Sequence, residues 1–210
     1  MTDGPPPRPD LPRDPAVSGG ARTPVLHLLA GPNGAGKSTF VARVLSPRTR
    51  LPFINADVIA AERWPEDAQS RSYEAAQIAA GLRARLLTER RSFITETVFS
   101  HPSKVDLVAH AGAAGYVVWL HVILVPEDTT VRRVTHRVDQ GGHTVPEEKI
   151  RTRYERLWPL VVQARGHADH TIVYDNSLAR SPFRRVAAYR RGALVGAADW
   201  PAWTPPVLRT

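Results

Sequence analysis

Residues 31–39 read Gly-Pro-Asn-Gly-Ala-Gly-Lys-Ser-Thr, and this stretch constrains the fold more than any other part of the chain. It matches the pattern G-x-x-x-x-G-K-[ST], in which glycines let backbone N–H groups turn toward phosphate oxygens. The apolar run 25–30 before it predicts a strand buried on both faces, and the residues from Lys37 predict a helix. A strand, a phosphate-binding loop and a helix in this order predict a nucleotide-binding α/β domain.

The loop supplies both backbone and side-chain groups to the predicted nucleotide site. We expect the Lys37 ammonium to contact the β and γ phosphates of ATP and the Ser38 hydroxyl to bind Mg²⁺. ATP and Mg²⁺ are therefore the expected cofactors. Only three residues of the whole chain are lysines, so a chance match to a motif that requires one is improbable. The predicted ATP-binding residues of the loop are Gly31, Pro32, Asn33, Gly34, Ala35, Gly36, Lys37, Ser38 and Thr39.

Strands and helices alternate along the rest of the chain. Short apolar runs bounded by turn residues predict strands at 52–55, 92–95, 117–125 and 170–174, and a hairpin near 191–192. Helical spacing predicts helices at 37–45, 72–91, 102–115, 127–140 and from 146 toward Pro159, the first of them stopping before Pro47. This alternation predicts a P-loop NTPase-type three-layer α/β fold with a mostly parallel sheet and helices on both faces.

The composition divides the chain into a tail and one domain. Residues 1–23 hold six prolines and few apolar residues, which predicts a disordered, Pro-rich tail. Residues 24–210 are then a single domain, with a helical lid at about 132–158 and a C-terminal extension at about 180–210. In that extension, Trp200 and Trp203 are expected to pack against the sheet edge or a neighbour and to have no catalytic role.

Several classes of protein are excluded by what the chain lacks. With no cysteine it has no disulfide framework, thiolate metal site or cysteine nucleophile. The longest apolar stretch, 117–125, is too short to cross a bilayer, and the first residues do not resemble a signal peptide, so we expect a cytoplasmic protein without membrane contact.

The net charge of +8 suggests an anionic partner, but its distribution does not favour nucleic acid. Residues 1–50 carry seven basic and three acidic side chains, a net +4; residues 51–150 carry eleven and thirteen, a net −2. A nucleic-acid channel would place its positive charge in that middle segment, where the candidate acceptor residues lie. A nucleic-acid-stimulated ATPase therefore remains only a minor alternative, and no nucleic-acid partner is expected.

A chain of this size has little material for a motor or a switch, so a small kinase is the leading class. Asp57 follows the second predicted strand and is either a base for an acceptor hydroxyl or a helix N-cap. Glu96 and Thr97 end the third strand at the same sheet edge. Glu96 is a candidate for Mg²⁺, directly or through water, or for a substrate hydroxyl; the alternative is a loop-entry residue.

Two arginine-bearing helices joined by Gly141-Gly142 predict a lid that closes over the transferring phosphate. Most of the arginines on these helices suit solvated faces. Arg137 and Arg153 are singled out because they lie beside the connecting loop or an aromatic residue. His143 in that loop is a weaker candidate.

The motifs GPNGAGKST, INADVIA, FITETVFS, RVDQGGHTVPEEKIRTRYERL and YDNS, in this order over residues 25–178, resemble the zeta-toxin family of P-loop kinases. The resemblance implies an ATP-dependent kinase that phosphorylates a hydroxyl of a nucleotide sugar, chiefly UDP-N-acetylglucosamine. It also implies a toxin held in check by an antitoxin, here a separate protein. By position it assigns Asp57 as the general base, Glu96 as the substrate-binding acid and Arg137 as a phosphate-clamping arginine.

Two positions depart from the family pattern. Val98 stands where the better-studied toxins have threonine, so Thr97 is the candidate for the missing sugar contact. His143 falls near the second lid arginine of those toxins, and Arg153 can supply that second charge instead. A phosphotransferase acting on another nucleotide sugar or on an antibiotic therefore stays open as an alternative.

Overall fold

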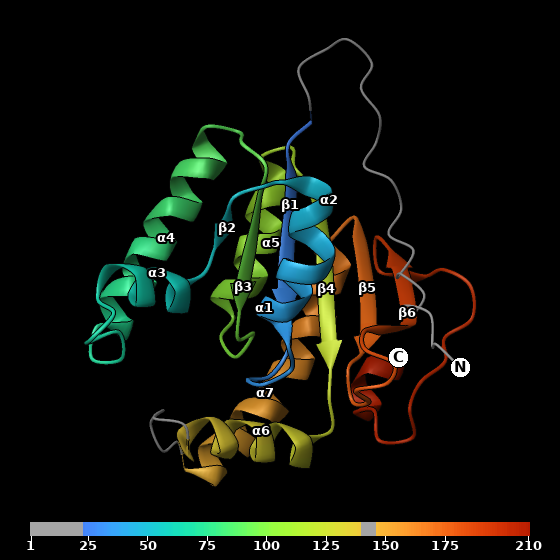
Figure 1. Cartoon of the computed structure of the whole chain (residues 1–210). Coiled ribbons are helices and arrows are strands. Elements are labelled where there is room, and N and C mark those ends of the chain that lie inside the picture. Colours follow the sequence, from blue (N-terminus) through green and yellow to red (C-terminus); the bar gives the residue numbers. More distant parts are fainter. Residues whose placement is uncertain (1–22, 140–145) are drawn as a thin grey trace, which may run out of the picture.

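A seven-stranded sheet forms the middle layer of the described protein, in the order β2-β3-β1-β4-β5-β6-β7 (Figure 1). The computed structural model describes residues 23–139 and 146–210. The first five strands pair in parallel, and β6 and β7 are antiparallel, which confirms the predicted fold class. The strands are β1 (Val25–Ala30), β2 (Phe53–Ile54), β3 (Phe93–Thr97), β4 (Val117–Leu124), β5 (His170–Asp175), β6 (Arg184–Arg190) and β7 (Ala193–Leu194).

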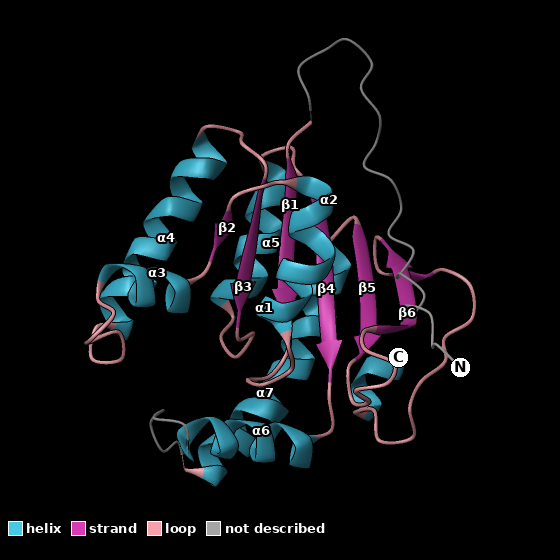
Figure 2. Ribbon diagram, viewed as in Figure 1, coloured by secondary structure: helices cyan, strands magenta, loops and turns pink. Residues whose placement is uncertain are grey.

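Helices cover both faces of the sheet (Figure 2). One face carries α4 (Ser72–Thr88), α5 (Ser103–Ala113) and α7 (Glu147–His167), and the other carries α1 (Lys37–Phe40) and the segments after it. The remaining helices are α3 (Ala56–Arg63), α6 (Glu127–Asp139) and the short 3-10 helix η2 (Pro206–Arg209). None of the helices in the described residues is both long and apolar enough to cross a membrane.

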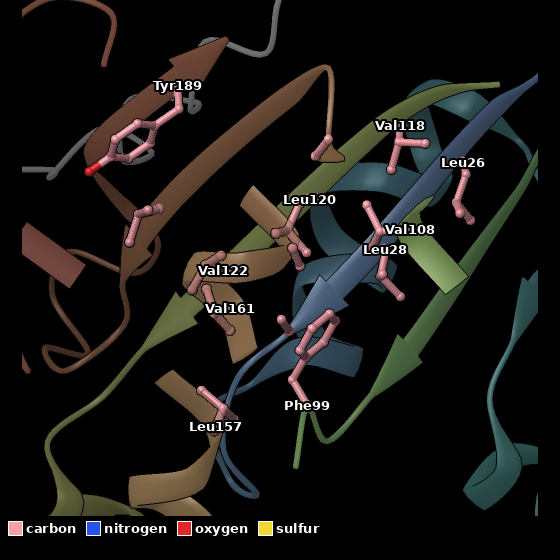
Figure 3. Close-up of a cluster of buried hydrophobic side chains, with 14 of the residues drawn as sticks. Leu26, Leu28, Phe99, Val108, Val118, Leu120, Val122, Leu157, Val161 and Tyr189 are labelled. Carbon is pink, nitrogen blue, oxygen red and sulfur yellow. The ribbon is translucent and has the colours of Figure 1, made fainter. Parts of the chain in front are cut away.

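The two faces hold separate apolar clusters because successive residues of a strand point to opposite sides. Leu26 and Leu28 of β1 belong to the cluster under α5 and α7, whereas Val25 and Leu29 face α1. In the first cluster (Figure 3), side chains of β1 and β4 pack against both helices, the labelled ones including Val108, Val118, Leu120, Val122, Leu157 and Val161. Both faces of the central strands are therefore buried, as the continuous apolar runs predicted.

The helix after the phosphate loop differs from the prediction of residues 37–45. It begins as α1, continues as a π-helical segment η1 (Val41–Leu45) and ends as α2 (Ser46–Thr49). Pro47 lies in the first turn of α2, directly after the π-helical segment, so the helical backbone continues through it. The prediction that the helix stops before Pro47 was therefore wrong, because the helix continues through this proline to Thr49.

The helix from residue 146 is also longer than predicted. It continues through Pro159 to His167, with Leu157, Trp158, Val161 and Ala164 buried on its inner side. Proline removes one backbone donor from the helix, but the burial of apolar side chains on both sides of Pro159 outweighs that loss. Pro159 itself is exposed. The prediction that the helix ends there was wrong.

The C-terminal part forms the hairpin predicted near 191–192, in which β6 pairs with β7. The C-terminal extension returns across α7, and Trp200 and Trp203 pack against the main apolar cluster. The predicted Pro-rich tail, residues 1–23, lies outside the described residues except for Thr23, and so does the Gly141-Gly142 break.

Two buried histidines lie beneath the helix that follows the phosphate loop. His27 of β1 and His121 of β4 are joined by a 3.0 Å contact between Nδ1 of His27 and Nε2 of His121. The rings of Phe40, Trp119 and Tyr174 surround them. Burial, and then the neighbouring His27, hold the pKa of His121 well below its usual value, so the imidazole is neutral in the folded protein.

Candidate functional site

The loop between β1 and α1 has the backbone shape that phosphate binding requires. Gly34 and Gly36 have φ values of 73° and 91°, in the left-handed region that favours glycine. A side chain at Gly31 would place its Cβ only 2.6 Å from the carbonyl oxygen of Ile123, and one at Gly36 would lie 2.6 Å from Asn176 Nδ2. Close packing around the loop therefore requires glycine at these positions.

Lys37 lies inside this loop and is 4% exposed. Its Nζ donates hydrogen bonds to the carbonyl oxygens of Gly31 (3.0 Å) and Pro32 (2.9 Å). Glu96 Oε1 lies 3.7 Å from the same nitrogen. The phosphate loop thus encloses the Lys37 ammonium group and holds it by two carbonyl oxygens at the start of the loop.

Glu96 joins three elements at the carboxyl edge of the sheet. β3 pairs with β1 so that Glu96 lies opposite Leu29, close to the start of the loop. Its Oε2 accepts hydrogen bonds from Ser38 Oγ (2.7 Å) and from Asn55 Nδ2 (3.0 Å). The carboxylate, a hydroxyl and the Lys37 ammonium are therefore gathered in one cluster.

Asn55 links that cluster to helix α3. Its Oδ1 accepts hydrogen bonds from the backbone N–H groups of Asp57 (2.7 Å) and Val58 (3.4 Å), so Asn55 is the N-cap. The alternative interpretation of Asp57 as the cap is therefore wrong. Asp57 lies in the first turn of α3 with an exposed side chain, and no described residue bonds its carboxylate.

Two residues that support the loop were not among the predicted site residues. Arg133 of α6 donates to the carbonyl oxygens of Gly34 (3.0 Å) and Asn176 (3.1 Å). The Asn176 side chain donates to the carbonyl oxygen of Ala35 (2.8 Å). Burial, and then the charge of Arg132, lower the pKa of the Arg133 guanidinium. The YDNS motif contains Asn176, but only the fold brings it beside the loop.

The structure describes the three lid candidates to different extents. Arg137 lies in α6, where its backbone but not its side chain is described, and His143 lies outside the described residues. Arg153 is exposed on α7 and lines a small crevice beside Pro32 and Asn33 of the loop. Val98 and Tyr154 line the same crevice, and Thr97 Oγ1 donates to the Val98 carbonyl (3.3 Å).

The residues present fit a nucleotide with a divalent cation. A loop whose glycines leave no space for a Cβ exposes its backbone N–H groups to a phosphate at the start of α1. The Ser38 hydroxyl and the Glu96 carboxylate are the hard oxygen donors that Mg²⁺ prefers, and they lie 2.7 Å apart. Ser38, with Glu96 beside it, is therefore the position that suits the cation.

Comparison with known protein families gives one match over most of the chain. The family model AAA_33, described as an AAA domain, matches residues 26–160. This range contains the phosphate loop, Asp57, Glu96, the whole of α6 and α7 as far as residue 160. No curated protein matches the chain.

Solved structures resemble the fold at low sequence identity. The PezAT toxin–antitoxin system of Streptococcus pneumoniae matches with 15% identity, 79% coverage of this chain, 72% coverage of that chain and a TM-score of 0.58. The AvrRxo1-ORF1:AvrRxo1-ORF2 complex matches with 16% identity, coverage of 82% and 60%, and a TM-score of 0.56. The Pnkp1/Rnl/Hen1 RNA repair complex matches with 20% identity, coverage of 70% and 48%, and a TM-score of 0.54. These similarities support the P-loop NTPase-like fold.

Proposed function

Because this chain belongs to the AAA_33 family of AAA domains, we propose that it is an ATP-dependent kinase acting on a small molecule. Its acceptor is a hydroxyl of a nucleotide sugar, with UDP-N-acetylglucosamine as the preferred substrate. The observation that carries the proposal is the position of Glu96, which bonds Ser38 of the phosphate loop and Asn55 at the head of α3. Nucleotide and acceptor groups thus meet at one edge of the sheet.

The nucleotide half of the site consists of residues 31–39. The backbone N–H groups of the loop bind the phosphates, and Lys37 moves from the loop carbonyls to the β and γ phosphates when ATP enters. Ser38 holds Mg²⁺, with Glu96 beside it or bonded to it through water. The cation, when bound, neutralises charge on the β and γ phosphates.

The acceptor half consists of Asp57, Glu96 and Thr97. Asp57 is exposed in the first turn of α3, and the Asn55 cap fixes the backbone there, so its carboxylate can accept the proton of the attacking hydroxyl. Glu96 and Thr97 end the neighbouring strand and orient the sugar. The hydroxyl oxygen forms a bond to the γ-phosphorus as the bond to the bridging oxygen of ADP breaks.

Positive charge at the transferred phosphate comes from the lid, residues 132–158. Arg153 lines the crevice beside Pro32 and Asn33, which supports a role for its guanidinium at the nucleotide phosphates. We assign Arg137 as the arginine that stabilises the transition state, and His143 as a contact to the acceptor. Arg133 has a different task, because its Nη1 and Nη2 already donate to the carbonyl oxygens of Gly34 in the loop and Asn176 after β5.

A separate antitoxin is the proposed protein partner. The PezAT and AvrRxo1 structures, which share the fold, are a toxin–antitoxin system and a two-protein complex by their own descriptions. A kinase that consumes a nucleotide sugar acts where that sugar and ATP are made, so we propose the cytoplasm as its location. The single kinase domain of residues 24–210 is part of the same proposal.

The proposed function is tested by incubating the protein with ATP, Mg²⁺ and a panel of acceptors. The panel holds UDP-N-acetylglucosamine, other nucleotide sugars, aminoglycoside and chloramphenicol-type antibiotics, and an oligonucleotide. Mass spectrometry then identifies the compound that gains one phosphate. Product from UDP-N-acetylglucosamine supports the full proposal, whereas product only from an antibiotic keeps the kinase and changes the acceptor. ATP hydrolysis that requires the oligonucleotide, without any phosphorylated product, contradicts the kinase.

Two variants separate the roles of the halves. Lys37→Ala is expected to weaken ATP binding and to lower kcat by roughly 10²–10³-fold, the usual loss for a positioned cationic or hydrogen-bonding group. Asp57→Asn is expected to leave ATP affinity unchanged and to lower kcat by about 10²–10⁴-fold, as removal of a general base does. Asp67→Asn, in the exposed loop after α3, is the matched control. Full turnover by Asp57→Asn would overturn the assignment of the base.

A further inference from the structure

A groove of about 680 Å³ lies between α6, α7 and the C-terminal segment, apart from the phosphate loop. Aromatic rings and prolines dominate it: Tyr154, Trp158, Pro159, Trp203, Pro205 and Pro206. Its volume is typical of a ligand site, which lies between roughly 300 and 1,000 Å³. Nothing in the proposed kinase chemistry uses this groove.

The walls of the groove are held in place by the rest of the fold. Arg165 of α7 donates to the carbonyl oxygens of Leu208 (3.4 Å) and Thr210 (2.7 Å). Arg209 donates back to the carbonyl oxygens of Pro201 (3.1 Å) and Ala202 (2.8 Å). Trp158 is 2% exposed and meets Tyr154 edge to face at 5.1 Å between ring centroids. The groove is therefore formed before any ligand arrives.

Negative charge borders the aromatic floor. Glu127, Asp128 and Glu155 all line the groove. The first two share a single cation, Arg151, which also bonds Glu147. Glu155 is exposed and has no ion-pair partner among the described residues. Three carboxylates and no basic side chain are among the residues that line the groove, so the groove attracts positive charge.

Aromatic rings flanked by carboxylates are the chemistry that recognises proline-rich segments carrying arginine. Prolines of an extended polyproline helix stack on the rings at little entropic cost, and the arginine pairs with a carboxylate. The chain contains such a segment in residues 5–9, Pro-Pro-Pro-Arg-Pro, which precede the described residues and carry no acidic side chain. We propose that residues 5–9 bind in this groove of their own chain, with Arg8 directed toward Glu155.

The connecting chain is long enough for this docking. The described chain begins at Thr23, next to the start of β1, whereas the groove lies beyond the carboxyl end of β4 at Pro126. β4 has eight residues, so the two ends of the sheet are about 26 Å apart. The thirteen residues 10–22 can extend over about 43 Å. A tethered segment needs little intrinsic affinity, because the tether keeps its local concentration high.

The absence of cysteine makes the docking measurable in the full chain. Leu11→Cys marks the tail next to the docked segment, and Ala202→Cys marks the exposed turn beside Trp203. Treatment with a short bis-maleimide reagent joins the two thiols only when they approach. The matched control pairs Leu11→Cys with Ala80→Cys, an alanine that is also exposed and lies on α4 at the opposite flank of the sheet. Circular dichroism and ATP binding report that each variant folds.

We expect intramolecular cross-linking to Ala202→Cys to be at least about tenfold faster than to Ala80→Cys, because docking raises the local concentration of the tail thiol. Arg8→Glu or Glu155→Arg alone lowers the faster rate toward that of the control. The two changes together restore it, since the charges are exchanged. Recovery of the cross-linking rate in the double variant indicates that the two side chains pair, because a defect in folding would not be reversed by the second change.

Equal rates at Ala202→Cys and Ala80→Cys overturn the docking. Mixing a chain that carries only Leu11→Cys with one that carries only Ala202→Cys tests the source of the segment. A cross-linked dimer in that mixture, formed faster than the intramolecular product, overturns docking within one chain in favour of the tail of a second copy. Failure of the acceptor panel leaves these measurements unaffected, because they do not depend on kinase activity.

Discussion

At the scale of single residues, the shape of the phosphate loop depends on hydrogen bonds to its carbonyl oxygens. Arg133 and the side chain of Asn176 donate hydrogen bonds to the carbonyl oxygens of Gly34 and Ala35 in the loop. With those oxygens fixed, the peptide planes between them are fixed as well, and the N–H groups keep one direction. Arg133 is therefore a positioning residue for nucleotide binding.

Arg133→Met is expected to weaken ATP binding by about 10- to 100-fold, because a hydrogen bond from a charged donor contributes about 1.5–3 kcal/mol. We expect KM for ATP to rise more than kcat falls. Isothermal titration with a non-hydrolysable ATP analogue measures the affinity. Arg132→Met is the matched control, since Arg132 is exposed and, within the described residues, bonds only the Thr129 hydroxyl (3.1 Å). Equal losses in the two variants would contradict the positioning role.

At the scale of elements, α7 is the clearest case of tertiary contacts that outweigh local preference. Pro159 stands in the middle of a 21-residue helix. The helix continues because Leu157, Trp158, Val161 and Ala164 are all buried against the sheet and α5. Proline disfavours a helix at this position, but the free energy gained by burying apolar side chains before and after Pro159 is larger than that cost.

Pro159→Ala is expected to raise the free energy of unfolding by roughly 1–3 kcal/mol, because it restores a backbone donor and a better helix former at an exposed position. Urea denaturation followed by circular dichroism measures the change. Leu157→Ala, two positions earlier and fully buried, is expected to lower the same quantity by about 2–5 kcal/mol. A decrease for Pro159→Ala would mean that the helix is bent to fit the proline.

At the scale of the whole molecule, the buried histidine pair ties stability to pH. The folded state holds the pKa of His121 below its value in the unfolded chain, which is about 6.5. Below that pH the unfolded chain binds more protons, so stability is complete above about pH 6.5 and falls as the pH decreases toward the folded pKa. The limiting slope for one such group is about 1.4 kcal/mol per pH unit.

Thermal unfolding between pH 7.5 and 5 tests this dependence. We expect the melting temperature to fall below about pH 6.5, and His121→Gln to flatten the fall, because glutamine cannot take up the proton. His110→Gln is the control, since that histidine is exposed on α5. A wild-type protein whose stability is constant over this range would contradict the account.

The sequence predicted the fold class, the positions of the parallel strands along the chain and the phosphate loop. These features depend on local patterns of apolar residues and glycine. It did not predict the loop supports Arg133 and Asn176, which lie 99 and 141 residues from the carbonyls they bond. It also left Asp57 open between base and cap; the Asn55 hydrogen bonds exclude the cap, and the base stays a proposal. Contacts between distant segments follow from packing, and a single sequence does not record packing.

The bonds of Lys37 to the carbonyl oxygens of Gly31 and Pro32 have a consequence for the energetics of ligand entry. The Lys37 ammonium group already donates hydrogen bonds to the protein. An incoming phosphate must therefore replace these carbonyl acceptors, and it does not meet an unpaired positive charge. The free energy of binding is then a difference between two well-bonded states. A triphosphate can replace the two carbonyl oxygens and Glu96 as partners of Lys37 at once, whereas a single phosphate ion replaces only one of them. The exchange therefore favours binding of a triphosphate over binding of a phosphate ion.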